Sequence, residues 1–167
     1  METITTSDWN TIFTKTLNTC HHDEQFMEYS AREKMLAFVF TFLQNLNNSN
    51  TPAFLSLLDK TSYPFLQKST LLSIKNDFMK FSDELLLDAN NSGEVQARLF
   101  IAKYYDTLLW NAFVSILYFW KNDTSENKEN TDVMVEKTVH FTFDLLAPNA
   151  LDSGIDLIQN FLKLRKK

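Results

Sequence analysis

The chain has 167 residues and a net charge of −5, and it combines 15 Phe with only 2 Gly and 3 Pro. That length is enough for one domain with a substantial core. Because β-hairpins depend on tight turns and usually on Gly, the composition predicts an all-α protein. The acidic balance argues against a broad nucleic-acid surface, which needs Lys and Arg to displace counterions.

The first part of the chain contains two amphipathic helix patterns. Residues 7–19 place Trp9 and Phe13 on one face, and Ser30 and Glu33 have the spacing of a capping box at the start of a second helix. The apolar residues of the second helix recur at steps of three and four: Met35, Phe38, Val39, Phe42, Leu43 and Leu46.

The middle of the chain predicts a short helix and then a longer one. An Asn-rich loop at 47–50 precedes a short helix over 51–58, which Pro52 opens, and Tyr63-Pro64 marks a break. The longer helix spans about residues 70–88, and a turn follows at 90–93. Its apolar residues form a seam that predicts contact with the core: Leu71, Ile74, Phe78, Phe81 and Leu85.

The stretch from Ser92 to Trp120 predicts one continuous central helix, with Ser92 as its N-cap. Apolar residues cover most of its sides, which is typical of a helix that is buried on most sides. A membrane span needs about 20 apolar residues, and Lys103 and Asp106 interrupt this run before it reaches that length. We therefore expect a core helix.

The last part of the chain predicts a polar loop over 121–130, a helix that Thr131 caps, and a final helix after Pro148. Together the patterns predict one helical domain over residues 1–167, with about six to eight helices. The helix after Thr131 has a wide inner face made of Met134, Val135, Thr138, Val139, Phe141, Thr142, Leu145 and Leu146.

Residue patterns typical of catalysis or metal binding are weak in this sequence. The run from His21 to Glu24 is better interpreted as a solvated loop, and Glu136 and His140 as a surface pair. The two Gly cannot form a phosphate-binding loop. We therefore expect a protein that is not an enzyme, with no catalytic residue, metal or cofactor. One cysteine and an N-terminus without signal-peptide features favour the cytoplasm.

The surplus of aromatic residues has two interpretations, a filled core or an apolar pocket between helices that carries a few polar groups. The sequence does not separate the two. The candidate pocket residues are Phe38, Phe42, Phe78, Phe81, Tyr104, Tyr105, Trp110 and Asn111.

Several stretches resemble the C-terminal domain of TetR-type transcriptional regulators, over about residues 26–162. They are helix-packing and loop signatures without catalytic content. The stretches are 29–38, 119–125, 128–132, 135–139, 143–146 and 150–152.

The TetR resemblance implies a cytoplasmic module that binds a small apolar ligand and forms a homodimer through a four-helix bundle, with no membrane span. It also implies that this chain does not contact DNA itself, because too few residues precede the matching region for a DNA-binding unit. The alternative is a lipid- or isoprenoid-binding accessory protein similar to the TetR-fold protein of ubiquinone biosynthesis. Carried over to this chain, the dimer interface would comprise Phe113, Ile116, Leu117, Trp120, Met134, Thr138, Phe141 and Leu145.

Overall fold

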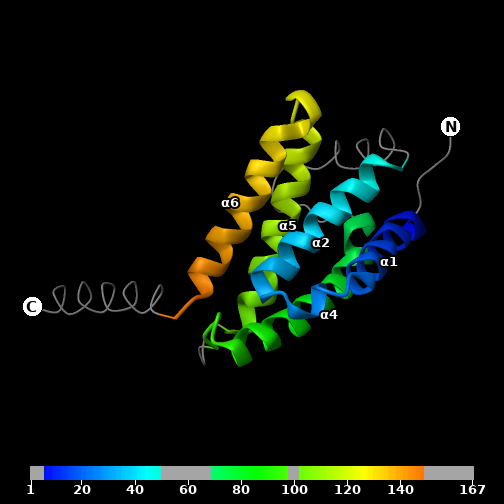
Figure 1. Ribbon diagram of the computed structural model, residues 1–167. Helices are drawn as coiled ribbons and strands as arrows, with labels where there is room; N and C mark the ends of the chain where they lie inside the picture. Colours follow the sequence, from blue (N-terminus) through cyan, green and yellow to red (C-terminus); the bar gives the residue numbers. More distant parts are fainter. Residues whose placement is uncertain (1–5, 50–68, 98–101, 149–167) are drawn as a thin grey trace, which may run out of the picture.

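The computed structural model describes residues 6–49, 69–97 and 102–148, except the side chains of 6–8 and 69–73. These residues form five α-helices, three short 3-10 turns and no strand, so the all-α prediction is confirmed (Figure 1). The helices expected over 51–58 and after Pro148 lie outside the described residues. The five helices are α1 (Thr6–His22), α2 (Ala31–Asn47), α4 (Ser69–Ser92), α5 (Tyr105–Asn122) and α6 (Glu129–Leu146).

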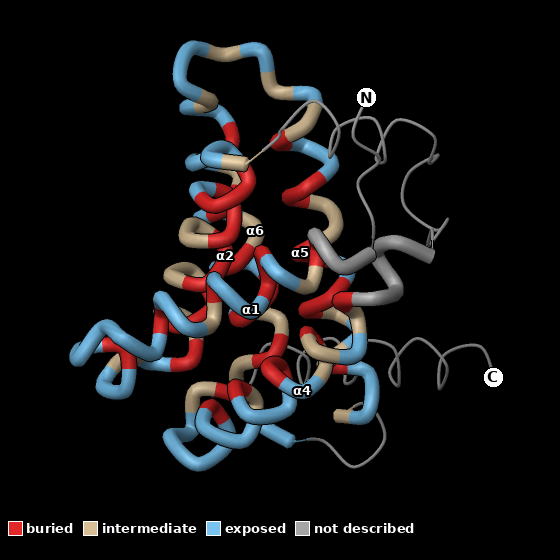
Figure 2. The backbone as a smooth tube through the Cα atoms, turned by 90° about the vertical axis from the view of Figure 1, so that its right-hand side faces the viewer, coloured by how far each residue is buried: buried red, intermediate tan, exposed pale blue. Residues whose placement is uncertain are grey.

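Helix α2 lies at the centre of the arrangement and contacts α1, α4 and α6, while α5 contacts α4 and α6. Helices α5 and α6 run antiparallel to each other and are joined by a short turn (Figure 1). Each helix turns its buried residues toward the others and its exposed residues outward (Figure 2). Within the described ranges, no helix is long and apolar enough to span a membrane.

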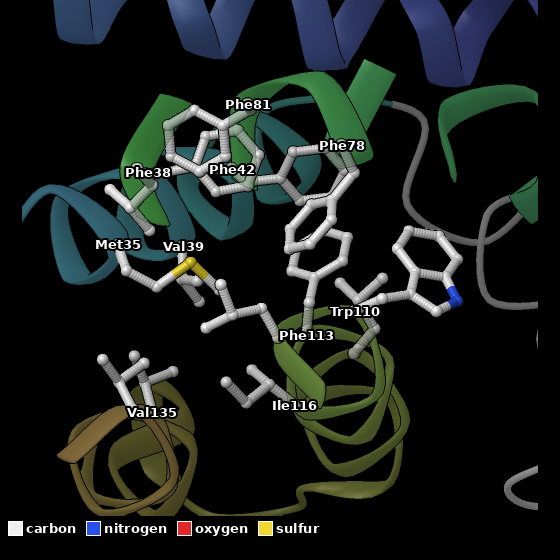
Figure 3. Packing of buried hydrophobic residues seen from close by; sticks show 14 of the residues in the cluster. Met35, Phe38, Val39, Phe42, Phe78, Phe81, Trp110, Phe113, Ile116 and Val135 are labelled. Carbon is white, nitrogen blue, oxygen red and sulfur yellow. The ribbon is translucent and has the colours of Figure 1, made fainter. Parts of the chain in front are cut away.

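Aromatic rings from α2, α4 and α5 pack together in the core. Phe38 of α2 stacks on Phe81 of α4 with ring centroids 4.6 Å apart, and Phe113 of α5 lies 5.1 Å from Phe42 (Figure 3). All four side chains are buried. These contacts are close enough for favourable aromatic pairing in addition to the burial of apolar area.

The start of α2 confirms the capping box that the sequence predicts. Ser30 Oγ accepts a hydrogen bond from the Glu33 amide at 3.3 Å, and Glu33 Oε2 accepts from the Ser30 amide at 2.8 Å. Hydrogen bonds from the backbone and the hydroxyl of Ser30 lower the pKa of Glu33. The box satisfies donors that the helix itself leaves unpaired, and so fixes where α2 begins.

The prediction of one continuous helix from Ser92 to Trp120 is wrong. Ser92 is the last residue of α4, and its hydroxyl donates to the carbonyl of Ala89 at 3.1 Å. Gly93 adopts a positive φ of 78°, and the Val95 amide donates back to Ala89. This is the C-terminal motif that Gly favours, and it ends a helix. Helix α5 begins only at Tyr105.

The prediction that Thr131 caps α6 is also wrong, because the helix begins at Glu129 and Thr131 lies within its first turn. The amide and hydroxyl of Thr131 both donate to Asp123 Oδ2, at 2.8 and 2.6 Å. Asp123 Oδ1 accepts from the amide and hydroxyl of Ser125. These bonds, with the Thr131 hydroxyl as the largest cause, hold the pKa of Asp123 well below its usual range. Asp123 therefore ties the end of α5 to the start of α6.

Candidate functional site

An apolar hollow of about 340 Å³ lies between the start of α5 and the end of α6. It unites three of the eight predicted pocket residues, namely Tyr104, Tyr105 and Asn111. The sequence patterns did not indicate its other lining residues as a pocket, although Leu108 and Leu145 follow the helical spacing of apolar positions. Those other residues are Thr107, Leu108, Leu145 and Leu146.

The remaining predicted pocket residues belong to the filled core. Phe78 lies between Phe81 and Trp110, with ring centroids 6.1 and 5.3 Å away, so these rings contact one another. Tyr104 is 58% exposed and lines the hollow without belonging to the core. The hollow therefore does not unite all eight predicted residues. The residues that the structure places in the core are Phe38, Phe42, Phe78, Phe81, Trp110 and also Tyr105, which lines the hollow as well.

A second groove of about 370 Å³ runs between α1 and α4, and it is the place where Phe81 reaches a surface. Its floor includes Phe13 and Leu17, and its rim carries Asp77, Lys80 and Glu84. Lys80 already pairs with Asp77 at 3.2 Å. The groove is more polar than the hollow beside α5, and nothing in it favours one class of ligand.

The backbone of Gln96 joins the two walls of the hollow. Its carbonyl accepts a hydrogen bond from the Tyr105 hydroxyl at 3.0 Å, and its amide donates to the carbonyl of Leu146 at 3.2 Å. Tyr105 belongs to the α5 wall and Leu146 to the α6 wall. The connecting segment, residues 94–96, therefore bridges these two walls.

The same connecting segment is anchored to α2 through Glu94. Its carboxylate accepts hydrogen bonds from the amides of Ala31 and Arg32, at 2.9 and 3.1 Å. These are the first two residues of α2, whose amides have no partner within the helix. The Arg32 side chain extends to α6. There its Nη2 donates a hydrogen bond to Asp144 Oδ1 at 2.7 Å, and its Nη1 lies 2.9 Å from His140 Nδ1.

A protein-family model described as "Tetracyclin repressor-like, C-terminal domain" matches residues 34–162 of the chain. The chain belongs to this TetR-like family. Comparison with curated proteins and with solved structures gave no match. As a TetR-like C-terminal domain, the chain is a regulatory ligand-binding and dimerisation module, and domains of this family are not enzymes. Within the described ranges, no group of three or more His, Cys, Asp or Glu residues is placed to hold a metal ion.

The structure divides the predicted dimer interface of this TetR-like domain into two groups. Phe113, Ile116, Leu117 and Trp120 of α5 are buried within the single chain, against its own helices. The four residues of α6 form a series along its outer side, where Phe141 is 63% exposed. Met134, Thr138 and Leu145 are partly exposed beside it.

Helix α5 has its own outer face, opposite its buried one. Leu108, Asn111, Ser115 and Tyr118 recur at steps of three and four and are exposed or partly exposed. Leu108, Asn111 and Leu145 all line the hollow, so the outer faces of α5 and α6 lie on the same side of the molecule. In this TetR-like domain, the hollow is at one end of that shared surface.

Proposed function

We propose that the chain is a single TetR-like effector module whose ligand is a small apolar molecule bound in the hollow between α5 and α6. The observation that carries this proposal is the lining of the hollow, where Leu108, Leu145 and Leu146 supply apolar walls. Tyr104 and Asn111 add a few polar groups at its edge. That combination is typical of small-molecule sites, where apolar surface supplies affinity and a few polar groups set orientation.

The size of the hollow favours a small ligand over an isoprenoid chain. Its volume of about 340 Å³ is near the lower end of the range for ligand pockets, roughly 300–1,000 Å³. A lipid accessory protein would need a longer apolar channel. Native mass spectrometry of the purified protein separates the two functions, because co-purifying lipid would support the alternative.

We further propose that the chain forms a homodimer through the outer faces of α5 and α6. Leu108, Ser115 and Tyr118 of α5 would meet the partner copy together with Met134 and Phe141 of α6. An exposed aromatic side chain in a partly apolar series supports this assignment, because such surfaces mark sites of association. In a two-fold dimer the same surface is used by both copies, which gives a four-helix arrangement.

Helix α1 belongs to the body of this module in our proposal. It contacts α2 and α4, and it contributes Trp9 and Phe13 to the core, while Thr16 accepts a hydrogen bond from Asn45 of α2 at 3.1 Å. We therefore assign no DNA contact to α1. We place the module in the cytoplasm, which agrees with its single, free cysteine.

The ligand proposal is tested by titration with N-phenyl-1-naphthylamine, a neutral apolar fluorophore. We expect saturable binding with one site per chain. Leu108→Trp fills the hollow and should abolish binding. Val133→Trp adds a bulky side chain at an exposed position of α6, outside both the hollow and the proposed dimer face, and should leave binding unchanged. Equal affinity of both variants and the unmodified protein would exclude the hollow as the binding site.

A further inference from the structure

We propose that Glu94 and Arg32 form a clamp that sets the shape of the ligand hollow and couples its occupancy to the start of α2. This inference rests on the proposed function of the hollow. Neither side chain lines the hollow, so both would be positioning residues without contact to the ligand. The clamp reaches the hollow through the backbone of Gln96, two residues beyond Glu94.

The hydrogen bonds at the start of α2 show why Glu94 is the main part of the clamp. Four amides at the start of a helix need partners outside the helical pattern. Here the Ser30 amide donates to Glu33 Oε2, the Glu33 amide donates to Ser30 Oγ, and the Ala31 and Arg32 amides donate to Glu94. Two of the four donors therefore depend on a residue more than 60 positions away in the sequence.

Burial separates the strong contacts of the clamp from the weak ones. The Glu94 side chain is 18% exposed, and its carboxylate also lies 3.7 Å from Arg32 Nε. The Asp144 side chain is 65% exposed, so its ion pair with Arg32 is screened by water and contributes little alone. Arg32 also lies over the ring of Phe143, with its guanidinium carbon 5.9 Å from the ring centroid. Arg32 thus orients the Glu94 carboxylate and joins it to α6 through its contacts with Asp144 and Phe143.

The clamp and the hollow are connected by a short, continuous path of hydrogen bonds. Glu94 holds the connecting segment against α2, Gln96 holds Tyr105 and Leu146, and those two residues form opposite walls of the hollow. A ligand that fits the wall separation of this structure binds best when Glu94 keeps its hydrogen bonds to the amides of Ala31 and Arg32. By thermodynamic reciprocity, the ligand then stabilises the clamp by the same factor.

The test compares two substitutions at the same end of α2. Glu94→Gln keeps the shape of the side chain, but its NH₂ group cannot accept a hydrogen bond, so one amide of α2 loses its acceptor. We expect N-phenyl-1-naphthylamine to bind about five- to tenfold more weakly, at the lower end of typical coupling between sites. Glu33→Gln weakens the capping box at the same terminus without touching the connecting segment. Its affinity should stay within about twofold of the unmodified protein.

A second measurement uses the unmodified protein, so it does not depend on a variant folding. Hydrogen exchange at the Ala31 and Arg32 amides should slow when N-phenyl-1-naphthylamine saturates the protein, although both amides lie outside the hollow. A purely structural role of Glu94 predicts no such change. Arg32→Gln should weaken binding in the same direction as Glu94→Gln, and the double variant should lose less than the sum, because the two residues act as a unit.

The outcomes distinguish this inference from the function on which it rests. If Leu108→Trp abolishes binding while Glu94→Gln leaves affinity and amide exchange unchanged, the clamp is wrong and the hollow stands. Equal losses in Glu94→Gln and Glu33→Gln would also overturn the clamp, because they would indicate general weakening of α2. If Leu108→Trp binds N-phenyl-1-naphthylamine normally, the hollow is not the binding site, and the clamp proposal, which depends on it, is also wrong.

Discussion

Phe78 of α4 and Phe113 of α5 stack with their ring centroids 5.0 Å apart and their planes 19° from parallel. Phe113 also lies 5.8 Å from Phe38, and Phe78 lies 6.0 Å from the same ring, so one aromatic residue of α2 contacts both. This cluster joins three helices at a single point (Figure 3). Much of the aromatic surplus in the sequence therefore serves the core.

Removing the central ring of this cluster should destabilise the whole domain. Phe113 is fully buried, so Phe113→Ala should lower the free energy of unfolding by about 3–5 kcal/mol, through lost burial and the cavity left behind. Phe119→Ala is the matched control, because Phe119 lies on the same helix but is 36% exposed, and should cost about 1 kcal/mol or less. Denaturant unfolding measures both. Equal losses would show that Phe113 is not central to the core.

A charge on the outer face of α6 should separate the proposed dimer without unfolding the monomer. Phe141→Glu places a carboxylate where we expect an apolar contact with the second copy. For a central interface residue the expected cost is about 2 kcal/mol or more, roughly thirtyfold in the dimer Kd. Sedimentation velocity over a range of concentrations measures the change, and circular dichroism should show unchanged helicity.

Val133→Glu is the control for that experiment. Val133 is exposed on α6 but lies outside the series that contains Met134, Thr138 and Phe141. The same chemical change there should leave the dimer intact. A dimer that survives Phe141→Glu would exclude this face of α6 as the interface.

Local sequence signals predicted the helices well because their causes lie within one or two helical turns. The spacing of Ser30 and Glu33 predicted the start of α2, since both partners of the capping box are close in the sequence. The four apolar positions Ile74, Phe78, Phe81 and Leu85 predicted the buried face of α4, because side chains three and four residues apart share a helix face.

The errors arose where distant residues decide the local structure. The helical pattern after Gly93 was misleading, because Glu94 bonds to the start of α2 and Gln96 bonds to the end of α6. Periodicity also showed that α5 is apolar on several sides, but it did not show which side other helices cover. Phe113 and Phe141 are the same residue type on neighbouring helices, yet one is fully buried and the other is mostly exposed.

Cys20 should react slowly with alkylating reagents in the folded protein. Its side chain is buried at the end of α1, and burial raises the pKa of the thiol. A hydrogen bond with the Thr41 side chain opposes this effect, and the charge of Asp23 adds to it. Since the thiolate is the reactive form, iodoacetamide should modify Cys20 far more slowly than N-acetylcysteine at the same pH. Mass spectrometry follows the adduct, and denaturation should restore fast reaction; fast alkylation of the native protein would contradict the buried position.

Asp123 should make the turn between α5 and α6 sensitive to acid. Its folded pKa lies below the unfolded value of about 3.9, because hydrogen bonds from Thr131 and Ser125 favour the charged form. A lowered pKa contributes stability that is fully present above the unfolded pKa and is lost as the pH falls toward the folded one.

Thr131→Val removes the hydroxyl that is the largest cause of the lowered Asp123 pKa. The variant should therefore be less stable at pH 7 and should lose less further stability in acid. The free energies of unfolding of the unmodified protein and the variant should therefore converge as the pH falls from about 5 to 2. Chemical denaturation at a series of pH values measures this convergence, and Asp123→Asn should flatten the dependence further. Curves that stay parallel across this range would show that the Asp123 hydrogen bonds do not link folding to protonation.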